Sequence, residues 1–379
     1  MAGTNKRQYN LDWIRVLATL AVFLYHCAMF FNPFPWHVKN NQIDSEGILV
    51  FSLFVGSWLM PIFFAVSGIS VFYALQKRTS KDYLHERLLR LGVPLLFGVV
   101  FLTVHQVYIE RITHNQFTGS FFDFLPHFLN GVYLEIGGTG NFAFFGLHLW
   151  YLFLLTIFSF LTLPLFKKFS GNAKFSMAHF VILSLLLFVT GTIETVNLGG
   201  WDLLFYLVIF IYGFYFFSSE SFKEAVKRTF KVHLTIAGIT SIVFIYMFMS
   251  NFPQSGSTAD TAFFAVHVIN CWSWLLCIFY FADKYLKKPN RFLKYGSEAS
   301  MPFYILHQPV IVLVGYLIYD LSWPLPLKVS FLVGGSFVII MLLYHFVICR
   351  IQILRFFFGM KGKKTAKAVA TDKNIPIKN

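Results

Sequence analysis

The sequence predicts an all-α polytopic membrane protein with about ten transmembrane helices and with both the N-terminus and the C-terminus cytoplasmic. Three observations predict this fold class: the composition, the length of the apolar runs, and the distribution of lysine and arginine. Of the 379 residues, 57% are hydrophobic and only 13% are charged, whereas a soluble domain carries about 25% charged residues. About 20 apolar residues cross a bilayer as a helix, and runs of that length are too long for barrel strands.

Apolar runs of this length follow one another along the chain. We expect transmembrane helices at residues 11–31, 49–76, 88–108, 147–166, 175–195, 201–218, 230–250, 261–281, 299–319 and 327–349. Together they form one membrane domain over residues 1–350. Residues 351–379 are basic, and we expect them to be a disordered cytoplasmic tail.

The basic residues orient the chain. If the N-terminus is cytoplasmic, 27 of the 31 lysine and arginine residues fall in cytoplasmic segments, which follows the positive-inside rule. The net charge of +14 is then explained by loops that face membrane lipid, and no nucleic-acid partner is expected. The sequence contains no Gly-rich phosphate-binding loop and no histidine–carboxylate spacing typical of a metal site. We therefore expect no metal and no tightly bound cofactor.

The first predicted span, "LDWIRVLATLAVFLYHCAMFF", contains two residues that are costly in lipid, Arg15 and His26. At about 100° per residue their side chains point within roughly 20° of each other, about 16 Å apart along the helix axis. Taken singly, Arg15 could extend to the cytoplasmic headgroups, and His26 could be a hydrogen-bonded packing residue. Together on one face they favour a protein-lined cavity and a functional site.

The pattern of an arginine, ten residues and a histidine in "DWIRVLATLAVFLYH" resembles the first span of membrane acyltransferase family three. Further segments are similar to that family and occur in its order: "FFAVSGISVFYAL", then "ERLLRLGVP" with Arg87 and Arg90 in the matching places, then "SMPFYILHQPV". The "HLWYLFLL" and "LHQP" segments resemble the branch that contains the glucan-biosynthesis protein C type succinyltransferases. The similarity runs from residue 9 to about residue 350.

This resemblance implies an integral membrane O-acyltransferase. The enzyme would move an acetyl or succinyl group from cytoplasmic acyl-CoA, its co-substrate, to a hydroxyl of a cell-envelope carbohydrate such as a glucan on the outer side. The expected location is the bacterial inner membrane. The expected partners are acyl-CoA, the carbohydrate acceptor and the lipid bilayer.

The resemblance places catalysis at His26 and Arg15. Imidazole ionises near neutral pH and suits general-base catalysis on a hydroxyl, but His26 could instead carry the acyl group covalently. Arg15 would hold the polar part of the CoA arm or a developing oxyanion. Arg87 and Arg90, at i and i+3, share a helix face and suit CoA phosphates; otherwise they are ordinary anchors of a cytoplasmic loop.

Five further residues are candidates for substrate binding, and packing or anchoring is the alternative for each. His307 is expected near the middle of the membrane, where it would orient His26 or bind the acceptor. His148 and Trp150 open the fourth predicted span at the outer face. Glu194 and Asp202 lie at the predicted outer rim and could contact acceptor hydroxyls.

Two other functions remain open on the sequence. One is a multi-span transporter or exporter of a sugar or of a lipid-linked intermediate, although the paired broken spans of many transporters are not evident. The other is a carrier in which His26 holds the acyl group for a separate outer transferase.

Overall fold

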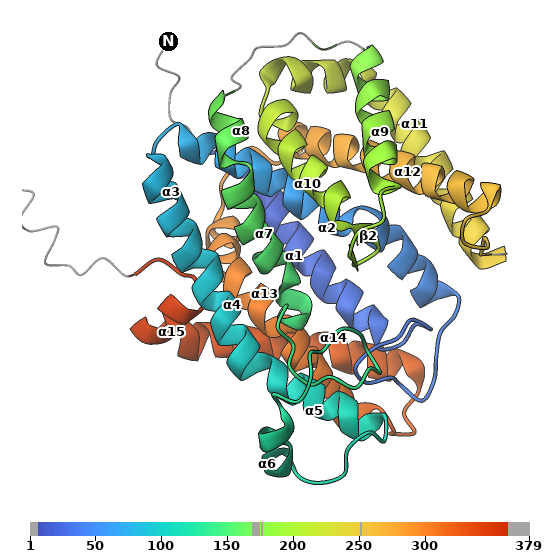
Figure 1. Ribbon diagram of the computed structural model, residues 1–379, viewed down its shortest axis with the longest axis vertical. Coiled ribbons are helices and arrows are strands. Elements are labelled where there is room, and N and C mark those ends of the chain that lie inside the picture. Colours follow the sequence, from blue (N-terminus) through green and yellow to red (C-terminus); the bar gives the residue numbers. More distant parts are fainter. Residues whose placement is uncertain (1–6, 169–174, 176, 251, 363–379) are drawn as a thin grey trace, which may run out of the picture.

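The protein is represented by a computed structural model, which describes residues 7–168, 175, 177–250 and 252–362. It is a bundle of helices with one very short hairpin (Figure 1). The α-helices are α1 (Tyr9–Met29), α2 (Gly47–Leu75), α3 (Ser80–Arg87), α4 (Val93–Phe97), α5 (Thr103–Thr113), α6 (Phe121–Phe124), α7 (Trp150–Leu161), α8 (Leu163–Lys168), α9 (Met177–Gly191), α10 (Leu203–Tyr212), α11 (Glu220–Ser250), α12 (Thr258–Tyr285), α13 (Arg291–Ile318), α14 (Leu325–Leu342) and α15 (Gln352–Phe357).

Tighter or wider helical turns adjoin several of these helices. The π-helical turns are η1 (Leu88–Gly92), η2 (Gly98–Leu102), η5 (Gly213–Phe217) and η6 (Leu343–Ile348), and the 3-10 turns are η3 (Leu125–His127) and η4 (Leu147–Leu149). The hairpin pairs β1 (Asn197–Leu198) with β2 (Trp201–Asp202) in antiparallel register.

In the described part of the chain, seven helices are long and apolar enough to cross a membrane. They are α1, α2, the continuous run Ser80–Thr113, α11, α12, α13 and the run Leu325–Ile348. The prediction of an all-α, multi-pass membrane protein is therefore confirmed. The other three predicted spans coincide with shorter apolar helical runs, Leu147–Leu161, Ala178–Gly191 and Leu203–Phe217, which fall below the length of about 20 residues that a perpendicular span needs. The number ten and the cytoplasmic termini stay predictions.

Helices α1 and α13 form the centre of the bundle. Helix α1 packs against α2 and α13, and α13 packs in turn against α5 and α14 (Figure 1). Every residue from 302 to 312 of α13 is buried, which is typical of a helix surrounded by other helices. A polar side chain on this stretch must therefore find its partner inside the protein.

The sequence predicts a disordered tail over residues 351–379, but the structure has helix α15 at the start of this segment. Phe358 is buried, with its ring centroid 5.4 Å from that of Phe97, and Arg355 is buried as well. Burial of these two side chains holds this part of the chain against the bundle. Residues 363–379 lie outside the described residues.

Helix α2 approaches the junction of α10 and η5 closely at a pair of glycines, Gly68 and Gly213. A Cβ added at Gly68 would overlap the Phe210 carbonyl oxygen, and one added at Gly213 would overlap the Ala65 carbonyl oxygen. Small residues at such crossings let helix backbones meet.

We expect Gly68→Ala to lower the stability of the protein by about 1–3 kcal/mol, because overpacking forces the two backbones apart. The measurement is the thermal unfolding midpoint of the purified protein in detergent. Gly238→Ala is the matched control, since a Cβ there would meet nothing within 4 Å and alanine is the better helix former. Equal midpoints for the two variants would contradict the assigned contact.

Candidate active site

A pair of histidines joins the two central helices. His26 on α1 and His307 on α13 lie edge to edge, with ring centroids 4.8 Å apart and planes only 6° apart, and His26 Nδ1 lies 2.6 Å from His307 Nε2. His307 Nδ1 lies 2.5 Å from the carbonyl oxygen of Tyr304. The structure thus brings together two of the residues that the sequence singled out.

The hydrogen bonds decide which nitrogen of each ring carries a proton. A carbonyl oxygen only accepts, so His307 Nδ1 must donate to Tyr304. In the neutral ring His307 Nε2 then accepts, and His26 Nδ1 donates to it. This arrangement leaves His26 Nε2 without a proton, as the atom able to act as a base or a nucleophile.

A third histidine contacts the pair. His148 lies edge-on to His307, with ring centroids 5.0 Å apart, and its Nε2 donates to the carbonyl oxygen of Ile305 at 3.1 Å. That carbonyl lacks its helical partner because Pro309, four residues on, has no N–H. His148 Nδ1 is a buried acceptor with no hydrogen-bond partner in the described structure. Although three histidines meet here, no group of three or more potential ligands among the described residues is arranged to hold a metal ion.

His26 lies near the C-terminal end of α1, and a cavity of about 320 Å³ opens near its N-terminal end, at Arg15. Four arginines and a single carboxylate, Glu86, are among its lining residues; the arginines are Arg15, Arg78, Arg87 and Arg90. Arg90 lies 3.4 Å from Glu86 and Arg78 also pairs with it, which leaves a surplus of positive charge. The structure therefore brings the three predicted arginines together and adds Arg78 to them.

Two tyrosines connect this cavity to the histidine pair. Ser67 lines the cavity, and its hydroxyl lies 2.7 Å from that of Tyr151. The Tyr151 and Tyr304 rings are 6.0 Å apart, and the Tyr304 ring is 5.5 Å from that of His307. A continuous series of contacts thus runs from the arginines to the imidazoles.

Three of the residues predicted to bind substrate contact other parts of the protein instead of the histidine pair. Trp150 packs against Phe64 and Tyr206. The carboxylate of Asp202 accepts hydrogen bonds from the backbone and hydroxyl of Thr195, so it stabilises the hairpin connection. Glu194 is exposed in the same connection. None of the three has a hydrogen bond or ion pair to the histidines in the described structure.

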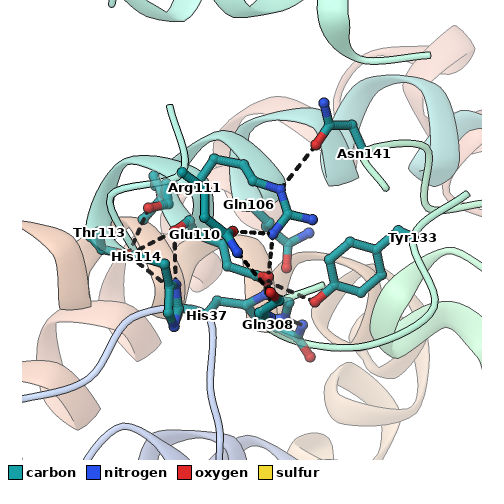
Figure 2. Close-up of polar contacts among 12 residues, drawn as sticks. His37, Gln106, Glu110, Arg111, Thr113, His114, Tyr133, Asn141 and Gln308 are labelled. Carbon is teal, nitrogen blue, oxygen red and sulfur yellow. Dashed lines mark hydrogen bonds and ion pairs between the residues drawn. The ribbon is translucent and has the colours of Figure 1, made fainter. Parts of the chain in front are cut away.

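A buried polar cluster around Glu110, which the sequence did not reveal, lies next to His307 in the chain through Gln308 (Figure 2). Glu110 on α5 is fully buried. Its carboxylate accepts from His37 Nδ1 at 2.6 Å, from the Tyr133 hydroxyl at 2.7 Å and from the Gly137 backbone N–H at 2.9 Å. Arg111, also buried, donates to it at 3.1 Å. An ionised carboxylate is stable inside a protein only with partners of this kind.

Arg111 fastens the loop of residues 114–146 to α5. Its guanidinium donates to Asn141 Oδ1 at 2.9 Å, to the Gly140 carbonyl at 2.7 Å and to Gln116 Oε1 at 2.6 Å (Figure 2). Burial and the neighbouring Glu110 carboxylate raise the pKa of Tyr133, so Tyr133 remains a neutral donor. The cluster holds residues from three separate segments in one arrangement.

One signal could have revealed this cluster. The third predicted span ends at residue 108, which places Glu110 and Arg111 beyond the predicted helix. In the structure α5 continues to Thr113 and carries both charges on a helix. A Glu–Arg doublet at the end of an apolar helix indicates a paired internal site, but its other partners are distant in sequence.

We expect Glu110→Ala to destabilise this part of the protein by about 3–5 kcal/mol, because it leaves a buried arginine without its carboxylate. The loop of residues 114–146 contains many phenylalanines, so chymotrypsin should cleave it faster in the variant. Exposed Glu135 offers the control Glu135→Ala, which should resist like the wild type. Equal cleavage rates for all three proteins would show that Glu110 does not hold the loop.

Residues 8–345 match the sequence model of the acyltransferase-3 family, described as an acyltransferase domain. The chain is similar to the proteins called glucans biosynthesis protein C of Shigella dysenteriae serotype 1 (strain Sd197) and of Escherichia coli (strain K12). It is 25% identical to each over 395 aligned positions, which cover 96% of this chain and 96% of the relative. No solved structure matches it. Because the family match spans most of the chain, this membrane protein is an acyltransferase that belongs to the acyltransferase-3 family.

Proposed function

We propose that this acyltransferase moves an acetyl or succinyl group from cytoplasmic acyl-CoA to a hydroxyl of a cell-envelope carbohydrate on the outer side of the bacterial inner membrane. The positive-inside charge distribution supports ten spans with cytoplasmic termini. The name of the similar proteins, glucans biosynthesis protein C, supports a glucan as the acceptor class. The arrangement of the histidine pair is the observation that carries the proposal.

The arginine cavity is the proposed site for the donor. CoA carries several phosphate charges, and guanidinium groups bind phosphate oxygens in bidentate geometry. Arg15, Arg87 and Arg90 line this cavity with Arg78. Arg15 and His26 are about 16 Å apart along α1 at 1.5 Å per residue, a separation suited to the extended thioester arm. Phosphates held at the cavity would then direct the acyl group towards His26.

The free nitrogen of His26 is the proposed general base. His26 Nε2 takes the proton of the acceptor hydroxyl while the hydroxyl oxygen bonds to the thioester carbonyl carbon. The carbon–sulfur bond then breaks, and the departing CoA thiolate takes that proton back from Nε2. His307 accepts from His26 Nδ1 and so stabilises the imidazolium that forms between these steps. The scheme uses acyl-CoA as co-substrate and involves neither a metal nor a tightly bound cofactor.

The first test replaces His26 with alanine. Loss of a positioned general base should lower the rate of transfer roughly 100-fold or more. The measurement is mass spectrometry of cell-envelope glycans from a deletion strain that carries no gene, the wild-type gene or the His26→Ala gene. The acetyl or succinyl ester should return only with the wild-type gene, and its mass identifies the donor. The control is His345→Ala. His345 contacts Tyr295 and not the histidine pair, so the gene with this substitution should restore the ester.

Identical glycans in all four strains would reject the carbohydrate acylation. Counterflow of sugar in proteoliposomes without acyl-CoA would then favour a transporter. A stable acyl adduct on His26, with no transfer to a glucan acceptor, would show that His26 acts as a covalent acyl carrier and not as a general base.

The second test concerns the donor site. We expect Arg87→Gln and Arg90→Gln each to raise the KM for acyl-CoA roughly 10-fold to 100-fold, the effect of a lost charged hydrogen bond of about 1.5–3 kcal/mol. The kcat should change little. With acyl-pantetheine, which has no phosphates, the variants and the wild type should behave alike. Lys231→Gln removes a cytoplasmic charge outside the cavity and is the control; an equal rise in its KM would indicate a general field effect.

A further inference from the structure

Trp36 contacts the proposed catalytic histidine from a loop that the sequence analysis did not single out. The loop, residues 30–46, connects α1 to α2. The Trp36 ring stacks on that of His26, with centroids 5.2 Å apart and planes 29° apart. Trp36 is buried, and its indole Nε1–H has no hydrogen-bond partner among the described residues. A buried N–H without an acceptor is costly, so a ligand atom at this position would satisfy it.

Lack of a partner does not by itself identify a site. Trp58, Trp201 and Trp272 also have buried indole N–H groups without partners in the described structure. Trp36 differs from these three because its ring lies against His26. The ring that carries this free donor therefore lies against the imidazole proposed to activate the acceptor.

The proposed reaction needs a donor at this place. As the acceptor oxygen attacks, the thioester carbonyl oxygen gains negative charge, and donors aimed at that oxygen lower the barrier. The ring N–H groups of the three histidines are already engaged: His26 donates to His307, and both His307 and His148 donate to backbone carbonyls. Among the described rings that contact the pair, only Trp36 has a free N–H.

The loop that carries Trp36 is held at several points. His37 donates to Glu110 and contacts the Gln308 amide at 2.9 Å, which ties the loop to the residue after His307. The Lys39 ammonium donates to the Met29 carbonyl at 2.6 Å. A donor on a loop fixed in this way needs little reorganisation when the reaction occurs.

Further along the loop, buried Lys328 donates to the side-chain oxygens of Asn40 and Asn41, each at 2.8 Å. The loop is therefore fastened to α14 as well as to α5 and α13. The buried Glu110 cluster and Lys328 together account for the fixed position of the Trp36 ring.

We propose that Trp36 is a catalytic residue whose indole N–H donates to the thioester carbonyl oxygen as that oxygen becomes an oxyanion. The carbonyl electron pair moves onto oxygen when the acceptor oxygen bonds to carbon. The pair returns when the thiolate leaves, and the indole keeps its proton throughout. This role rests on the acyl transfer proposed above. In this scheme the buried Glu110–His37 contact does not touch the reacting atoms; it positions the loop that carries Trp36.

The test removes the N–H while keeping the ring. In Trp36→3-benzothienylalanine, introduced by stop-codon suppression, sulfur replaces the indole nitrogen at nearly unchanged shape; Trp36→Phe is the genetically simpler companion. With acetyl-CoA, succinyl-CoA and a linear glucan oligosaccharide, we expect kcat to fall roughly 100-fold, with the KM for acyl-CoA within about twofold of the wild type. Trp272→Phe, which removes an equally unpartnered indole remote from the pair, should keep the wild-type kcat.

A spectroscopic readout separates this role from packing. In a His26→Ala background, which stops turnover, [1-13C]acetyl-CoA is bound and its carbonyl stretch is recorded by isotope-edited infrared spectroscopy. A hydrogen bond from Trp36 lowers that frequency, and the benzothienyl variant should lose the shift. An unchanged kcat in both Trp36 variants beside an active wild type would overturn the role of Trp36 and leave the proposed function intact. A wild type that transfers neither acyl group would overturn both.

Discussion

The hydrogen bond between His26 and His307 is the interaction on which the rest of the site depends. It joins α1 to α13 where α13 is buried on every side. In such surroundings an unpaired imidazole N–H is costly, so the two helices must meet at this register. The bond to the Tyr304 carbonyl then fixes the proton positions through both rings. One hydrogen bond thus positions two helices and leaves one defined nitrogen available for chemistry.

The same constraint explains the polar groups on either side of the pair. Charges within a helical bundle require partners, and the two ends meet this requirement differently. At the arginine end Glu86 is shared by Arg78 and Arg90, and Asp12 pairs with Arg15 at 3.2 Å. Four arginines still face only these two carboxylates, so a cavity with spare positive charge remains. At the other end the carboxylate of Glu110 is fully satisfied. The first arrangement suits an anionic ligand, and the second suits a rigid support.

Proline contributes to the site through the carbonyl that it frees. Pro309 cannot donate to the carbonyl of Ile305, and His148 supplies the missing hydrogen bond. His148 is thereby placed against His307 with its other nitrogen unpaired. A break in the regular helix hydrogen bonding therefore places a polar side chain beside the reacting groups.

The sequence by itself determined the properties that depend on composition and on local spacing. The apolar runs indicate a multi-pass helical protein, and the spacing of Arg15 and His26 places both on one face, because a helix repeats every 3.6 residues. The order of the short motifs was sufficient to indicate the acyltransferase family. The span boundaries were less accurate: α5 runs past the predicted end to Thr113, since a charged helix end with internal partners does not have to stop where hydropathy falls.

Only the tertiary structure decided which side chains are hydrogen-bond partners of the buried polar residues. His26 and His307 are 281 positions apart, and His37 and Glu110 are 73 apart, so no local pattern could pair them. The proton positions, the contact of Trp36 with His26 and the grouping of four arginines all follow from how distant helices and loops pack. The physical reason is that burial makes an unpaired polar group costly, while the identity of its partner depends on which segments the fold brings within hydrogen-bonding distance.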